Sequence, residues 1–171
     1  MENEKSREVW LRGSLPDIPL LLQPAAHALL QSKEEVFKYT ATFPEALLWK
    51  KPAGRASVGF HLQHITGVLD RMLTYAEEKS LSETQFEYLR KEGFEGREVK
   101  IANLKKAFTE KVDEALQTFK NTPEAILTEK RTVGRKKLPS SVIGLYFHAA
   151  EHSQRHIGQM LVTISVLESE I

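Results

Sequence analysis

Residues 57–76 read SVGFHLQHITGVLDRMLTYA. Their apolar side chains recur at alternating steps of four and three residues, at Val58, Leu62, Ile65, Leu69, Met72 and Ala76. This spacing places one apolar stripe along an α-helix, and helices of a bundle pack through such stripes. Ser57 is a suitable N-cap, because its hydroxyl can accept a hydrogen bond from a free N–H of the first turn. The stretch therefore predicts a bundle helix that begins after Ser57.

Similar apolar spacing predicts three more long helices, and an almost complete lack of alternating strand patterns favours an all-α four-helix bundle. These three helices are expected from about Pro24 to near Phe43, from about Val99 to Phe119, and from Ser140 or Ser141 to the C-terminal region.

The connections between the long helices contain one further short helix. The capping-box sequence Ser82-Glu83-Thr84-Gln85 predicts its start, and Gly93 and Gly96 are expected to end it near Glu92. Residues 44–57 and 121–139 are expected to be loops, the second with a small hairpin around Val133-Gly134.

The composition limits the class of protein. A chain of 171 residues is expected to form one domain, residues 1–171, in which residues 1–15 are an N-terminal extension. The 24 basic and 23 acidic residues give a net charge of +1, which does not favour binding to nucleic acid or to a membrane surface. The chain has no cysteine, which excludes disulfides, zinc ribbons, iron–sulfur clusters and a cysteine nucleophile. The N-terminal sequence has no signal-peptide pattern, so a cytoplasmic location is expected.

Five of the six histidines lie in two short windows. His61 and His64 belong to the second predicted helix, and His148, His152 and His156 belong to the last one. Residues three or four apart share a face of a helix, and both histidine faces border the apolar stripe. Neutral imidazoles gathered at a helix contact are suited to a divalent transition metal, but a buried histidine can also be a hydrogen-bonded core residue. Spacing alone leaves both interpretations open.

Several known metal and nucleophile motifs are absent. The stretch from His152 to His156 lacks the glutamate of the H-E-x-x-H zinc-protease motif. No histidine has a glutamate three residues before it, as di-iron bundles require, and there is no phosphate-binding glycine loop and no G-x-S-x-G motif.

Residues 57–75 and the run HAAEHSQRHIGQ at 148–159 resemble the second and last helices of DinB-like proteins, and the similarity extends over residues 15–168. The resemblance implies an up-down-down-up four-helix bundle, a homodimer, and one divalent metal held by three histidines. Carried over to this chain, the metal ligands are His64, His152 and His156, with His61 as the alternative one turn away. His61, His148 and Gln159 are then expected to contact the ligands or to line the pocket.

The same resemblance implies an enzyme that acts on a small molecule. Characterised members include S-transferases that use a low-molecular-weight thiol, which the metal would bind as a thiolate for attack on a small electrophile. The alternatives are a hydrolase that uses metal-bound water and a non-enzymatic metal-binding bundle. Zinc or nickel suits three imidazoles best, and iron or manganese is also possible. Neither a nucleic-acid partner nor a membrane partner is expected.

Overall fold

The computed structural model describes residues 7–94 and 99–170, and it is mostly helical with one small two-stranded sheet. The described residues form five α-helices: α1 (Gln23–Tyr39), α2 (Val58–Ala76), α3 (Glu83–Lys91), α4 (Ile101–Asn121) and α5 (Val142–Glu168). The strands are β1 (Lys130–Val133) and β2 (Leu138–Ser141), and single 3-10 turns lie at Val9–Arg12, Leu20–Leu22, Glu45–Leu47, Pro52–Gly54 and Glu124–Ile126. The prediction of a mostly helical chain is confirmed.

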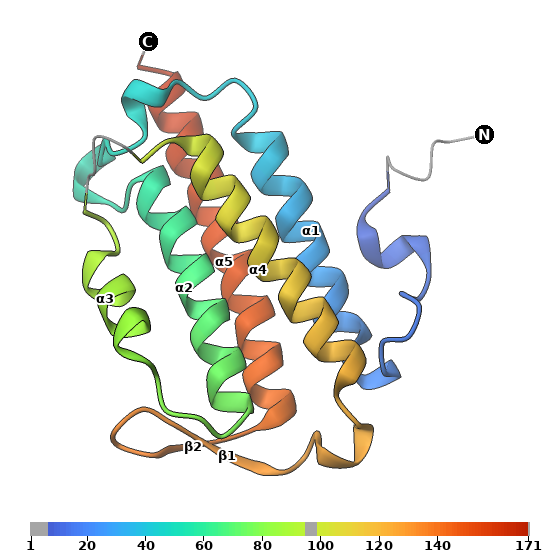
Figure 1. Cartoon of the computed structure of the whole chain (residues 1–171). Coiled ribbons are helices and arrows are strands. Elements are labelled where there is room, and N and C mark those ends of the chain that lie inside the picture. The colour runs from blue at the N-terminus through green and yellow to red at the C-terminus, as the bar shows by residue number, and fades with distance from the viewer. Residues whose placement is uncertain (1–6, 95–98, 171) are drawn as a thin grey trace.

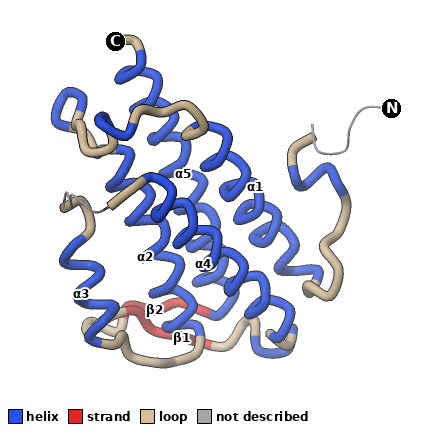
Figure 2. Tube along the Cα trace, turned by 45° about the horizontal axis from the view of Figure 1, so that its top comes forward, coloured by secondary structure: helices blue, strands red, loops and turns tan. Residues whose placement is uncertain are grey.

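The four long helices lie side by side (Figure 1). Helix α5 contacts both α1 and α2, and α4 contacts the same two helices from the other side. The short helix α3 lies against α2 at the edge of this group, as the tube view also shows (Figure 2). The predicted ligand histidines of α2 and α5 therefore lie on two helices that are in direct contact.

Serine hydroxyls begin three of the helices, as the sequence predicts. The side chain of Ser57 accepts a hydrogen bond from the backbone N–H of Phe60, and Ser141 accepts one from Gly144. Ser82 and Gln85 form a complete capping box at the start of α3. Each cap satisfies an N–H group that the helix itself leaves free, and so fixes where the helix starts.

The apolar stripes predicted for α2 and α4 lie in one hydrophobic core. All six stripe residues of α2, from Val58 to Ala76, are buried. The stripe of α4 is buried as well, at Ile101, Leu104, Phe108, Val112, Ala115 and Phe119. Burial of these side chains is the main force that holds α2, α4 and α5 together.

Two helix boundaries differ from the sequence prediction. Helix α1 ends at Tyr39 instead of near Phe43, because both the backbone N–H and the hydroxyl of Thr40 donate to the carbonyl of Val36 and close the last turn. Helix α4 is displaced by two residues and runs from Ile101 to Asn121. The predicted role of Gly96 in ending α3 lies outside the described residues.

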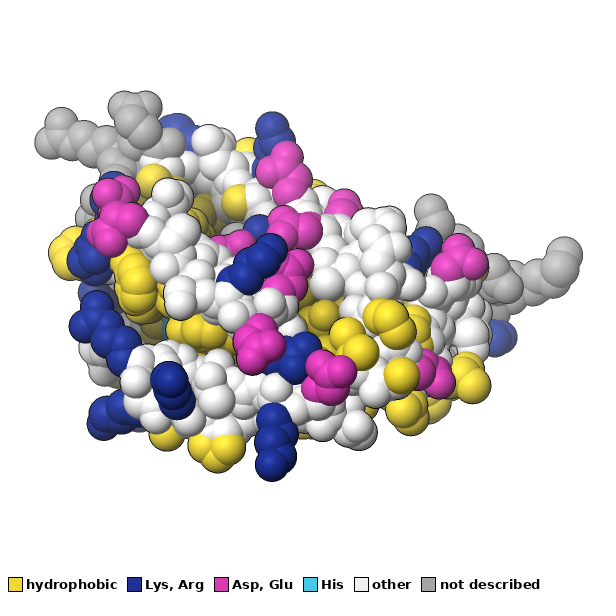
Figure 3. All heavy atoms as spheres, turned by 60° about the horizontal axis from the view of Figure 1, so that its bottom comes forward, with side chains coloured by type: hydrophobic (Ala, Val, Ile, Leu, Met, Phe, Trp, Pro, Cys, Tyr) yellow, Lys and Arg dark blue, Asp and Glu magenta, His cyan; other side chains and the backbone are white. Residues whose placement is uncertain are grey.

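The predicted hairpin is present at one end of the bundle. Strands β1 and β2 pair antiparallel from Lys130 opposite Ser141 to Val133 opposite Leu138, and Gly134 in the turn has a positive φ of 66°. The basic run 135–137 in this turn is exposed, and Figure 3 shows Lys and Arg side chains gathered on the left of this face. Among the residues that the structure describes, no helix combines the length and the apolar character that a membrane span needs.

Candidate metal centre

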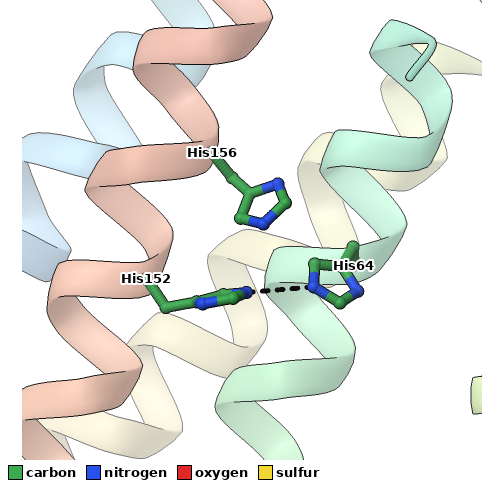
Figure 4. Close-up of side chains that lie close together, drawn as sticks. All are labelled: His64, His152 and His156. Carbon is green, nitrogen blue, oxygen red and sulfur yellow. Dashed lines mark hydrogen bonds between the residues drawn. The ribbon is translucent and has the colours of Figure 1, made fainter. Parts of the chain in front are cut away.

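Three histidines from two helices converge at the contact between α2 and α5. His64 projects from α2, and His152 and His156 project from successive turns of α5 (Figure 4). Each offers one ring nitrogen, and these nitrogens all lie within 4.8 Å of one another. His64 Nε2 and His152 Nε2 lie 2.9 Å apart, within hydrogen-bond distance. The predicted ligand set is therefore brought together in space.

An aromatic side chain covers the cluster on the α2 side. The ring of Phe60, one turn before His64, stacks on its imidazole with centroids 5.1 Å apart and an interplanar angle of 13°. The Phe60 ring also lies 6.3 Å from that of His156. This ring excludes water from one side of the cluster and restricts the rotation of His64.

The surroundings keep the imidazoles of His152 and His156 neutral. Burial, and then the neighbouring histidines and Arg155, lower the pKa of His152 to about 3. Burial, His64 and Arg155 lower the pKa of His156 to about 4. A transition metal binds the neutral form of imidazole, so the two residues are in the protonation state that a metal requires well below neutral pH.

A chain of hydrogen bonds assigns the protons on two of the rings. Arg155 Nη2 lies 2.8 Å from His152 Nδ1, and because a guanidinium only donates, Nδ1 is an acceptor. The proton of neutral His152 is then on Nε2, which donates to His64 Nε2. His64 in turn carries its proton on Nδ1 and donates it to Glu92 Oε2, at 2.6 Å.

Glu92 is a site residue that sequence reasoning missed. It is the C-cap of α3, its side chain is only 5% exposed, and its second oxygen accepts a hydrogen bond from Arg71 Nη1 at 2.7 Å. Helical spacing could not identify it, because it comes from a different element than the histidines. The signal that was available is Gly67, one turn from His64, where a Cβ would collide with Glu92 Oε1 and would lie 2.7 Å from Arg71 Nη1.

The other predicted site residues have different surroundings. His61 is buried, and its Nδ1 lies 3.0 Å from His156 Nδ1, so it contacts the cluster from the side of the protein core. His148 is more exposed and pairs with Glu151 at 3.0 Å; these two form a second group with His152 that could also hold a metal. Gln159 is exposed on α5, and in the described part of the chain it forms no hydrogen bond to any histidine.

The donor set fits a divalent transition metal. Three neutral imidazoles leave further coordination positions open, and imidazole suits zinc, nickel, copper and iron. The hydrogen bond from His64 Nδ1 to a buried carboxylate is the support that metal-ligating histidines commonly have, and it leaves Nε2 facing the other two rings.

The fold and the site together define a mostly helical protein with a cluster of three histidines, between two of its helices, that could hold a metal ion. The family model of the DinB superfamily matches residues 28–160, which include all three histidines. The chain belongs to the DinB superfamily. No curated protein is similar enough to the chain to be matched with it.

Proposed function

We propose that the chain binds one divalent transition metal through His64, His152 and His156, and that it does so within an up-down-down-up four-helix bundle. The observation that carries the proposal is the convergence of three imidazole nitrogens within 4.8 Å. The lowered pKa values of His152 and His156 and membership of the DinB superfamily support it. The directions of the four long helices in Figure 1 support the bundle order.

The chain's own residues hold and orient the ligands. Phe60 stacks on the ring of His64, and Glu92 accepts a hydrogen bond from Nδ1 of His64. The buried side chain of His61 contacts His156. When bound, the metal supplies a Lewis acid that lowers the pKa of a thiol or water molecule reaching it. The remaining coordination positions are available to a small molecule, because the protein supplies only three nitrogens.

The activity that we infer is transfer of a low-molecular-weight thiol to a small electrophile, by a cytoplasmic homodimer. The absence of cysteine is compatible with it, because the reacting sulfur would then come from the cosubstrate. A hydrolase is less well supported. The carboxylate nearest to the cluster, Glu92, already accepts hydrogen bonds on both oxygens, from His64 and Arg71, and is not free to act as a general base.

The experiment starts with protein purified without a histidine tag. We expect elemental analysis to find about one zinc or nickel ion per chain, and calorimetry to detect thiol binding that a chelator abolishes. A matched control is His27→Ala, because His27 is the sixth histidine and bonds the backbone of Gly13, away from the cluster. Metal-loaded protein that binds no thiol would exclude the transferase, and protein that takes up no divalent metal would exclude the metal centre.

A further inference from the structure

The side chain of Glu92 makes contacts that the end of helix α3 does not require. Its side chain is 5% exposed, and burial of a carboxylate is costly unless the group is paired and hydrogen-bonded. Both oxygens are satisfied, one by Arg71 and the other by His64. Arg71 is itself buried, so this ion pair connects α2 to the end of α3 inside the protein.

The segment around Glu92 is fixed by two further contacts with α2. The hydroxyl of Tyr88 donates to the carbonyl of Gln63, and the backbone N–H of Gly93 donates to Gln63 Oε1. Gln63 directly precedes His64, so the α3 end is held against the turn of α2 that carries this histidine. Gly67 leaves the space that the carboxylate and the guanidinium occupy.

The hydrogen-bond directions give this carboxylate a defined effect. A carboxylate only accepts, so it selects the His64 tautomer with the proton on Nδ1. The same tautomer follows independently from the opposite end of the chain of bonds, where Arg155 can only donate to His152. With the proton on Nδ1, the lone pair of His64 Nε2 faces His152 and His156.

We propose that Glu92, held by Arg71, is a positioning residue that fixes the tautomer and orientation of His64 for metal binding. The inference rests on the proposed metal-binding function, and it extends that function to a residue outside the three histidines. The competing explanation is that Glu92 only docks α3 on α2, in which case its effect on His64 is incidental.

The test uses Glu92→Gln, which keeps the size but removes the charge and replaces one of the two acceptor oxygens by an NH2 group that only donates. The double variant Arg71→Gln with Glu92→Gln makes the same change and leaves neither buried charge alone. Glu87→Gln is the matched control, because it makes the same change on the exposed face of α3. Nitrogen-15 NMR of the metal-free proteins measures which ring nitrogen of His64 carries the proton. Titration with Zn²⁺ measures the dissociation constant.

We expect wild-type His64 to carry its proton on Nδ1, and both Glu92 variants to lose this preference. Their Zn²⁺ dissociation constants should rise about 10- to 100-fold, while that of Glu87→Gln stays at the wild-type value. A wild-type proton on Nε2 overturns the proposal, and so does a folded Glu92 variant with unchanged tautomer and affinity. If the wild type binds no zinc, the proposed function fails, whereas the NMR result still decides what Glu92 does to His64.

Discussion

His61 and His64 lie one turn apart on α2, yet the structure gives them different surroundings. His64 turns its Nε2 towards His152, whereas His61 is buried behind the cluster and pairs through Nδ1 with His156. His64, and not His61, therefore belongs to the group of three histidines that could hold a metal.

This difference predicts opposite outcomes for two alanine variants. His64→Ala should lose high-affinity Zn²⁺ binding and remain folded, because its side chain is partly exposed. His61→Ala should still bind Zn²⁺, but it should lose about 2 kcal/mol of stability, because it leaves a cavity and an unpaired nitrogen on His156. Calorimetric titration and urea unfolding measure the two effects. Loss of zinc binding in His61→Ala alone would show that the ligand is one turn away from the position assigned here.

The buried imidazole of His61 also predicts how stability depends on pH. Burial and the neighbouring His156 and His64 lower its pKa from 6.5 to about 4. Below pH 6.5 the unfolded chain takes up a proton that the folded protein does not, so stability is lost as the pH falls from 6.5 to about 4 and is unaffected by this group above 6.5. The loss from His61 is at most about 3 kcal/mol.

Urea unfolding of the metal-free protein between pH 7.5 and 4 tests this expectation. His61→Leu should be less stable at neutral pH, because His156 loses a partner, but its stability should fall less steeply towards pH 4. An equally steep fall in the variant would assign the pH dependence to other groups, first of all His152 and His156, whose pKa values are also lowered.

At the scale of elements, sequence pattern and structure agree where the cause is local. The stripe of α2 and the caps at Ser57 and Ser82 are properties of neighbouring residues, and both were predicted correctly. The start of α5 was predicted as Ser140 or Ser141, and Ser141 is its N-cap. The histidines were found for the same reason, since each window is one helix face. Glu92 was not found, because its position depends on the path of the α2–α3 connection and on packing against Gly67. The apolar spacing within one helix gives no information about such a contact between two helices.

The contact between α2 and α3 predicts that Gly67→Ala is harmful although alanine favours helices. The new Cβ would collide with Glu92 Oε1 and lie 2.7 Å from Arg71 Nη1 and 2.8 Å from the ring of Tyr88, so these side chains must shift and the ion pair that holds Glu92 beside His64 is disturbed. We expect a loss of about 1–3 kcal/mol together with weaker Zn²⁺ binding.

Gly158→Ala provides the control on α5, because within the described residues no heavy atom beyond the local helix backbone lies within 4 Å of the Cβ that it adds. This substitution should stabilise the protein by up to about 1 kcal/mol through helix propensity alone. Thermal unfolding measures the stability of the two variants, and zinc titration measures their affinity. The comparison is between an added methyl group that contacts α3 and one that is exposed to solvent. Equal stability and affinity for both would mean that α3 does not depend on the space at Gly67.

At the scale of the whole molecule, the histidine cluster connects segments that are far apart in the chain. His64 and His152 belong to helices that contact directly but are separated by α3, α4 and the hairpin. A metal held by both helices binds the folded protein and not the unfolded chain, which has no assembled site. Binding of this kind raises the free energy of unfolding by about 2.7 kcal/mol when the free metal is 100 times its dissociation constant.

We therefore expect Zn²⁺ at that excess to raise the melting temperature of the metal-free protein by roughly 5–10 °C, and a chelator to reverse the rise. The double variant His152→Ala with His156→Ala should show no rise, because only one of the three ligands remains and a single imidazole does not join α2 to α5. Differential scanning calorimetry of both proteins, with and without zinc, measures the shift. The same rise in the double variant would place the bound metal elsewhere on the chain, and no rise in the wild type would mean that the cluster holds its imidazoles together through their own hydrogen bonds rather than through a metal.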